Sequence, residues 1–269
     1  GSWYRSVIKE AIFDLLATEI TAAQHDLESK IFMLSPWLRN VEFGSSGRGN
    51  LRLIMRYLPS RTTLFELLEI YLEKGGVLDI VCLPPHELLN QDQIDTLLQL
   101  HHLREIISPD REIQSLISAE IDRASSEFLI HRPMLEFLAN LKKRFRDRVN
   151  ITYNERLHAK VLVGQRLAIL GSANITQRGL SSSDELCMIT DEPSAVRSIK
   201  EFCTAASSRE FCMKSSNYVM AEHFQELGDL GKLHPDIGDI FELLGQSLSC
   251  AEARVAEFEF GRFWKAPEV

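Results

Sequence analysis

The segment from Leu157 to Asn174 restricts the fold of this chain most, because it predicts two short strands joined by a tight turn. Outside the turn its odd positions are apolar or glycine, whereas its even positions include His158, Lys160 and Ser172. Side chains alternate between the two faces of a strand. We therefore expect one face of this hairpin in a core and polar side chains on the other.

The length of the turn decides which side chains share a face, since a shift of one residue exchanges the two faces of a strand. A three-residue turn at positions 164–166 would place His158 directly opposite Ser172. The His, Lys, Ser and Asn side chains would then converge, whereas a two-residue turn would put Ser172 and Asn174 on the wrong face. We therefore expect the three-residue turn.

These side chains suit an oxyanion, most simply a phosphate. Lys160 supplies a positive charge, and Ser172 and Asn174 supply neutral donors. His158 can attack phosphorus as a nucleophile or transfer a proton near neutral pH. Glu185 comes eleven residues after Asn174, at the start of another expected strand, and its carboxylate can orient the ring of His158.

The order His-x-Lys, Gly-Ser-x-Asn and then Glu resembles the phospholipase D superfamily, whose members carry the HKD motif. The family motif usually has an Asp five residues after the Lys, and this chain has Gln165 there. That Asp is generally thought structural, and position 165 falls in the expected turn. The alternative is a solvent-exposed polar hairpin in which His158 and Lys160 are incidental. The matching residues are His158, Lys160, Gly171, Ser172, Asn174 and Glu185.

The resemblance implies an α/β fold, a phospholipase D-like α-β-α sandwich with a mixed, largely parallel central sheet. It also implies a metal-independent phosphodiesterase that forms a covalent phosphohistidine and needs no cofactor. No second His-x-Lys is present, so we expect a homodimer through the face bearing His158, with one composite site. One His158 would attack and the other would protonate the leaving oxygen, while Lys160 and Asn174 clamp phosphate oxygens and Glu185 orients each His.

The resemblance allows DNA, RNA or lipid phosphodiesters, so the choice of substrate is analogy. We expect a nuclease with DNA favoured over RNA, in the manner of family members linked to bacterial defence against foreign DNA. No secretion signal or lipid-binding amphipathic helix is evident, which favours a cytoplasmic protein without stable membrane association. The alternatives are a phospholipase D or phosphatidyl transferase, and a catalytically silent nucleic-acid-binding scaffold.

Three further residues are candidates for substrate binding. Trp37 follows a buried strand at 31–34, and the alternative for it is an ordinary core tryptophan. Arg48 lies in a Gly/Ser-rich stretch after that strand, which could equally be a plain surface loop. Arg178 follows Asn174 closely and is a weaker candidate.

The net charge of −8 argues against nucleic-acid binding by bulk electrostatics. Ten acidic and only four basic residues fall between Glu222 and Glu268, however, so most of the negative charge lies in that tail. The segments 39–61 and 142–148 are locally basic. For the second of them we favour complementation of a helix C-terminus over nucleic-acid contact.

The five cysteines have no C-x-x-C spacing, which favours free thiols over disulfides. No set of histidines and cysteines has metal-ligand spacing, so we expect no metal site and treat His101 and His102 as ordinary surface or capping residues.

The remaining pattern alternates strands and helices. Strand 31–34, helix 64–74, Gly75-Gly76 and strand 77–83 predict a crossover between parallel strands. Residues 90–107 and 111–124 predict helices that form an insertion at about 90–125. We expect a catalytic domain over residues 1–219 and an acidic, mostly helical extension over residues 220–269, packed on the domain or on the dimer partner.

Overall fold

The structure is a computed structural model that describes residues 3–43, 62–83, 91–107, 110–154, 157–181, 185–207 and 228–239. Arg48 and the expected domain boundary at 219/220 lie outside these residues. The described chain divides into two compact units. The first comprises residues up to Leu83 and those from Asn140 to Ser207, and the second comprises the described parts of 84–139 and 228–239.

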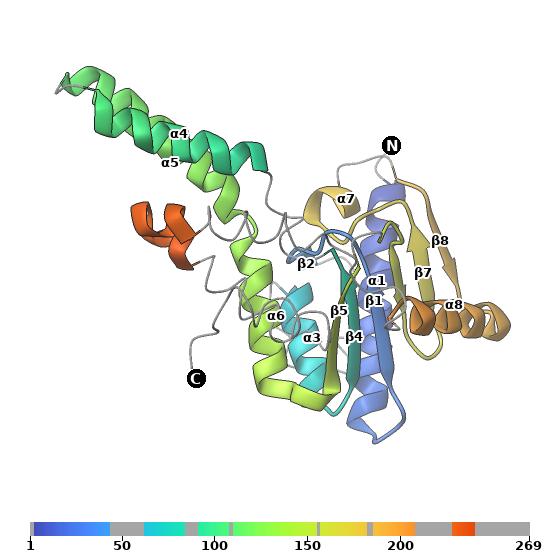
Figure 1. The fold of residues 1–269 in the computed structure, drawn as a ribbon. Helices are drawn as coiled ribbons and strands as arrows, with labels where there is room; N and C mark the ends of the chain where they lie inside the picture. Colours follow the sequence, from blue (N-terminus) through green and yellow to red (C-terminus); the bar gives the residue numbers. More distant parts are fainter. Residues whose placement is uncertain are drawn as a thin grey trace. The chain divides into compact units, whose positions relative to one another are not determined.

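A six-stranded sheet with the order β5-β4-β1-β6-β7-β8 forms the centre of the first unit (Figure 1). Strand β1 pairs in parallel with β4, and β4 with β5, whereas β6, β7 and β8 continue the sheet from β1 with antiparallel pairing. The predicted α/β class with a mixed sheet is therefore confirmed, with the parallel pairing confined to β5-β4-β1. The strands are β1 (Lys30–Leu34), β4 (Val77–Cys82), β5 (Val149–Tyr153), β6 (Val161–Val163), β7 (Ala168–Gly171) and β8 (Cys187–Thr190).

The parallel crossover is present as predicted, with α3 (Leu64–Glu73) between β1 and β4. A capping box begins α3, since the Thr63 side chain accepts from the Glu66 amide and the Glu66 side chain accepts from the Thr63 amide. Gly75 ends the turn after α3 with a φ of 100°, which favours glycine. A two-stranded ladder of β2 (Glu42–Phe43) and β3 (Thr62–Thr63) precedes α3.

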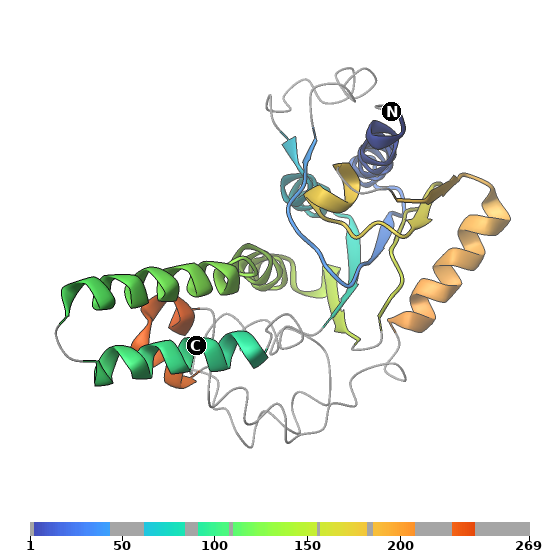
Figure 2. The ribbon, with the colours of Figure 1, turned by 90° about the horizontal axis from the view of Figure 1, so that it is seen from above.

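Helices cover both faces of the sheet (Figure 2). On β6, Val161 and Val163 pack with Val196 and Cys203 of α8 (Pro193–Ala206) in one buried cluster. The intervening Leu162 is not in that cluster, and it lines a hollow together with Val161 and residues of α1 (Trp3–Gln24). The strict alternation of a strand thus sends alternate side chains of β6 to α8 and to α1.

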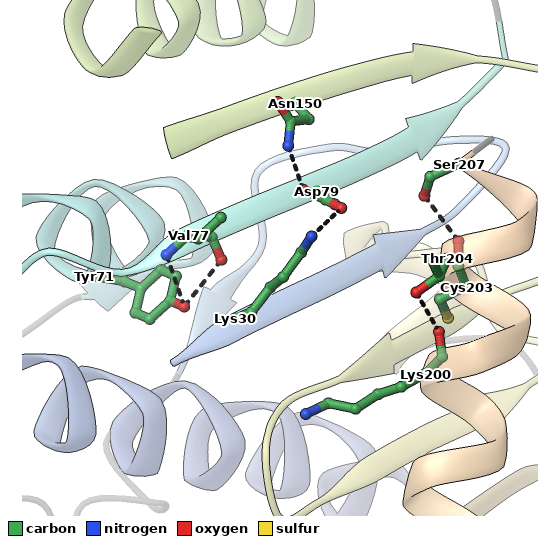
Figure 3. A network of polar contacts seen from close by, with 9 residues as sticks. All are labelled: Lys30, Tyr71, Val77, Asp79, Asn150, Lys200, Cys203, Thr204 and Ser207. Carbon is green, nitrogen blue, oxygen red and sulfur yellow. Dashed lines mark hydrogen bonds and ion pairs between the residues drawn. The ribbon is translucent and has the colours of Figure 1, made fainter. Parts of the chain in front are cut away.

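Polar side chains also occur on the α8 side of the sheet. Buried Asp79 of β4 pairs with Lys30 of β1 at 2.8 Å and accepts a 2.8 Å hydrogen bond from Asn150 of β5 (Figure 3). The charge of Asp79 is thereby matched by a cation and a donor, which a buried carboxylate requires.

The second unit contains the helical hairpin of α4 (Gln91–Ile106) and α5 (Arg111–Leu129), the first part of α6 (Arg132–Phe145), and short helices at 228–233 and 235–239. The prediction that His101 is a surface residue is wrong, because its side chain is only 2% exposed. His101 shares a helical stripe with buried Ile94 and Leu97, and its ring lies 6.4 Å from that of His234, centroid to centroid. His102 is exposed, as expected.

Among the described residues, Cys82, Cys187 and Cys203 are free thiols, as expected. Within the same residues, no helix has the length and apolar character needed to cross a bilayer.

Candidate active site

The hairpin of β6 and β7 has a different register from the one predicted. Val163 lies opposite Ala168, and the Gly164 amide donates a 2.9 Å hydrogen bond to the Leu167 carbonyl. The connection therefore has four residues, 164–167, and the three-residue turn is wrong. The apolar character of Leu167 suggested a strand position, but its carbonyl is used inside the turn.

The observed register places different residues beside His158 and Lys160. The Gly171 amide donates to the Lys160 carbonyl at 3.2 Å, and Gly171 pairs with Cys187 of β8. When this pairing is continued by two residues, Ala173 rather than Ser172 comes opposite His158, and Glu185 comes opposite Ala173 on the β8 side.

Ser172 binds Glu185. Its hydroxyl donates to the Glu185 carboxylate and accepts a 3.1 Å hydrogen bond from the Leu186 amide, while its own amide donates to the Leu186 carbonyl at 3.0 Å. Ser172 therefore holds the carboxylate at the start of β8. The convergence of Ser172 with His158 expected from a three-residue turn does not occur.

Gly171 is required by the close approach of β8. A Cβ at this position would collide with the Leu186 carbonyl oxygen. The glycine of the Gly-Ser-x-Asn motif thus allows the segment that carries Glu185 to lie directly against the hairpin.

His158 and Lys160 precede β6, on an open part of the structure. The His158 side chain is exposed, and its ring makes no hydrogen bond to any described residue. The Lys160 ammonium donates to the His158 carbonyl at 2.6 Å and lies at a small hollow that is otherwise mostly apolar, with Ile8 and Ile12 of α1 in its wall. Both a nucleophile and a cation are therefore available to an anion.

Asn174 lies at the turn into α7 (Gln177–Ser181), and its Oδ1 atom is buried without a hydrogen-bond partner among the described residues. The Thr176 amide donates to the Asn174 carbonyl at 2.8 Å. Gly179 packs so closely that a Cβ there would meet the Asn174 backbone. An unpaired buried acceptor is costly unless a donor from a ligand or water pairs with it, and the donor that Asn174 can offer to a phosphate oxygen is its Nδ2 amide group.

The end of β1 supports the Asn174 segment. Ser35 Oγ accepts a 3.1 Å hydrogen bond from the Ile175 amide and donates to the Trp37 carbonyl at 2.6 Å. The Arg39 amide donates to the Ile175 carbonyl at 2.9 Å. Half-buried Trp37 thereby lies on the segment that adjoins Asn174–Thr176.

Sequence reasoning did not single out Ser35 or Arg39. The only signal for Ser35 was a lone polar residue directly after an apolar strand, at positions 31–34. Of the other candidates, Arg178 is exposed on α7, and the position of Arg48 lies outside the described residues.

The basic residues that end α6 are used in contacts within the first unit. Lys142 donates to the carbonyls of Arg146 and Val149 at 3.1 and 2.8 Å, and Arg144 pairs with Glu69 and Glu73 at 3.3 and 2.9 Å. Arg148, in the short 3₁₀ helix η3 (Arg146–Arg148), donates to the Leu72 carbonyl. These contacts agree with the structural interpretation of the segment, since cations near helix ends bind free carbonyls.

Among the described residues, no group of three or more His, Cys, Asp or Glu side chains has the arrangement of a metal site.

Comparisons with known proteins give a matching family model and distant solved structures. The family model described as "Cardiolipin synthase, PLD-like domain" matches residues 45–205, while no curated protein matches the chain. NucT from Helicobacter pylori is a solved structure with a TM-score of 0.35 and 15% identity, and the match covers 75% of this chain and 91% of NucT. The family model spans more than half of the 269 residues and includes the whole His158–Glu185 region, and the chain therefore belongs to this phospholipase D-like family.

Proposed function

We propose that this protein is a metal-independent phosphodiesterase, most suitably a nuclease acting on DNA, that forms a covalent phosphohistidine at His158. The observation that carries the proposal is the exposed, unpaired imidazole of His158 beside Lys160, with Glu185 two strands away in the continued register. Membership of the phospholipase D-like family supports the same reaction class.

In the proposed first step, a ring nitrogen of His158 attacks phosphorus, and the bond from phosphorus to the leaving oxygen breaks. The Lys160 ammonium and the Asn174 amide bind the non-bridging oxygens, where negative charge develops. In the second step, water attacks the phosphohistidine and releases the phosphate ester. Glu185 orients the imidazole across Ala173, and Ser172 holds the Glu185 carboxylate in place.

One histidine cannot be nucleophile and general acid in the same step, so we propose a composite site in a homodimer. The His158 of the partner subunit would give its proton to the leaving oxygen and later take one from water. Exposed apolar side chains at β8, next to Glu185, support a protein contact here, since Leu186 is 82% exposed and Met188 52%.

A lipid phosphodiester is the second candidate substrate. The hollow at Lys160 is lined mainly by aliphatic side chains, among them Ile8, Ile12 and Leu180, which suit an apolar substituent next to the phosphate. DNA remains the first candidate by analogy within the family, and a role in defence belongs to that analogy.

The test is hydrolysis of bis(p-nitrophenyl) phosphate, labelled single- and double-stranded DNA, and phospholipid vesicles, each in excess EDTA. We expect wild type to cleave at least one substrate and His158→Ala to lose at least about a thousandfold in kcat, because the nucleophile is absent. His102→Ala, at an exposed histidine of α4, is the matched control and should retain activity.

Cleavage of DNA but not of vesicles supports the nuclease, and the reverse result supports the lipid enzyme. DNA binding without turnover of any substrate would instead favour a silent scaffold. Wild-type protein quenched in alkaline detergent should also carry phosphate label on an acid-labile, base-stable bond, and His158→Ala should not.

A further inference from the structure

The tip of the hairpin is bound by a buried carboxylate from another part of the chain. Glu19 lies near the C-terminal end of α1 and is only 2% exposed. Its Oε1 atom accepts a 2.5 Å hydrogen bond from the Gln165 amide, and Oε2 accepts one of 2.5 Å from the Ser29 hydroxyl. Gly164 has no room for a Cβ, which would collide with the Glu19 carboxylate.

The same turn is bound from the other face of the sheet. The Lys200 ammonium donates to the side-chain carbonyl of Gln165, and the Lys200 side chain extends from α8 (Figure 3). Burial lowers the pKa of Lys200, and the nearby charge of Glu19 opposes that shift. Gln165 therefore lies between an anion of α1 and a cation of α8, bound to the first through its backbone and to the second through its side chain.

The contacts of Glu19 continue into the parallel half of the sheet. The Ser29 hydroxyl lies 3.1 Å from the Tyr71 hydroxyl, which donates to the Val77 carbonyl at 3.0 Å and accepts from the Val77 amide at 3.1 Å (Figure 3). Burial raises the pKa of Tyr71 to about 12, so the phenol stays neutral. The hairpin turn is thus connected to the start of β4 through buried side chains.

The residues of β6 do not by themselves specify its register. Val161, Leu162 and Val163 are all buried, so exchanging the two faces would still bury apolar side chains. The same exchange would turn His158 and Lys160 away from the face that bears Glu185. Some contact outside the strand must therefore select the active register, and the turn is where such contacts are found.

We propose that Glu19 is a positioning residue that fixes the register of the catalytic hairpin by holding the Gln165 amide, while Lys200 of α8 holds the Gln165 side chain. The helix thereby supplies the carboxylate at the position where the family motif has an Asp in the turn itself. A carboxylate at position 165 would lie close to that of Glu19, and the two anions would have to share the Lys200 ammonium. The catalytic part of this proposal rests on the proposed function, while the structural part does not.

The test compares Glu19→Leu, Glu19→Gln, Gln165→Asp and the double variant Glu19→Gln/Gln165→Asp, with Glu10→Gln of α1 as control. Three properties are measured in the full-length protein: hydrogen exchange of the amides at 164–167, the midpoint of thermal unfolding, and kcat and KM on the preferred substrate.

Glu19→Leu should speed exchange of the Gln165 amide at least tenfold and lower kcat roughly tenfold to a hundredfold with KM nearly unchanged, because the hairpin is misplaced and not unfolded. Glu19→Gln keeps an acceptor and should retain most of the amide protection. Gln165→Asp places two carboxylates together and should lower the thermal midpoint, and the double variant should recover that loss.

Two results would overturn the proposal. One is normal amide protection and kcat in Glu19→Leu, and the other is simple addition of the two single losses in the double variant. If Glu19→Leu does not fold, the thermal midpoints of Glu19→Gln, Gln165→Asp and the double variant still test the proposal, because they give the sign of the coupling between positions 19 and 165. If wild type cleaves none of the substrates, the proposed function fails. Amide exchange and thermal unfolding still test whether Glu19 holds the turn at Gln165.

Discussion

At the scale of single residues, the candidate site depends on three glycines at which a Cβ would collide with a neighbouring segment. A Cβ on Gly171 would collide with the Leu186 carbonyl, and one on Gly179 with the Asn174 backbone. A Cβ on Gly164 would collide with the Glu19 carboxylate. Each glycine thus brings a second segment against the hairpin or its continuation. The contacts that result position Glu185 and Asn174, which the proposed mechanism needs.

Gly171→Ala should lower kcat strongly and lower the free energy of unfolding only moderately. The added Cβ would push β8 and Glu185 away from the hairpin, while most of the sheet stays paired. We expect a loss of roughly a hundredfold in kcat and about 1–3 kcal/mol in unfolding free energy. Gly75→Ala is the control, since strain at its φ of 100° should cost about 1 kcal/mol with kcat unchanged. Equal kcat in the two variants would contradict this role for Gly171.

The three described thiols should differ in reactivity. Burial raises the pKa of Cys82 and of Cys203 to about 12, and Asp79 adds to the effect at Cys203, whereas Cys187 is half-buried with a smaller rise in pKa. Only the thiolate is a strong nucleophile. Iodoacetamide at pH 8 should therefore label Cys187 well before the other two, as read by peptide mass spectrometry. Labelling after denaturation is the control, and early modification of Cys203 would count against the packing of α8 on the sheet.

At the scale of elements, buried His101 of α4 and half-buried His234 connect the 228–239 segment to α4 within the second unit. The Arg104 guanidinium lies 3.3 Å from His101 Nδ1, which must act as the acceptor because a guanidinium only donates. The proton of neutral His101 is then on Nε2, which is buried and unpaired among the described residues, as is Nδ1 of His234. A second proton on His101 would face Arg104, so the arrangement requires neutral His101.

Stability of the second unit should fall below about pH 6.5, the ordinary histidine pKa. Burial, then Arg104 and His234, lower the pKa of folded His101, against an opposing effect of Glu105. The unfolded chain consequently binds more protons, and the stabilisation is complete above the unfolded pKa and is lost as pH falls toward the folded one. Urea unfolding should show a lower midpoint at pH 5 than at pH 7. His101→Leu should reduce this difference, and an unchanged difference would assign the pH dependence to other groups.

At the scale of the whole molecule, the proposed chemistry requires two copies of the chain. Each copy contributes one His158, and exposed Leu186, Met188 and Ile189 lie next to Glu185. The net charge of −8 does not favour attraction of nucleic acid by the protein as a whole. Binding would therefore depend on local groups such as Lys160.

Leu186→Arg should shift the protein toward monomer and lower activity, because it places a desolvated charge in the proposed interface. We expect at least a tenfold weaker dimer by analytical ultracentrifugation, with specific activity that falls on dilution. Ile106→Arg, at a side chain 65% exposed on α4, is the matched control and should leave both unchanged. A fully active Leu186→Arg monomer would refute the composite site.

Much of the fold is predictable from sequence because its elements follow local rules. The expected helix at 64–74, the Gly75-Gly76 stop and the apolar run of β4 predict the parallel crossover that is observed. The motif likewise supplies a set of candidate site residues. The hairpin register was predicted wrongly, since alternation assigned Leu167 to a strand and gave no indication that Glu19 binds the turn from 146 residues away.

The sequence by itself determined the α/β class, the order of the elements and the presence of a His-Lys-Asn-Glu set, because periodicity and short motifs are properties of neighbouring residues. Only the tertiary structure decided that Ser172 binds Glu185, that Ser35 supports Ile175 and that His101 is buried. Each of these depends on segments that pack together although they are distant in the chain. In β6 all three side chains are buried, so no local pattern can select a register, and contacts with α1 and α8 make that choice.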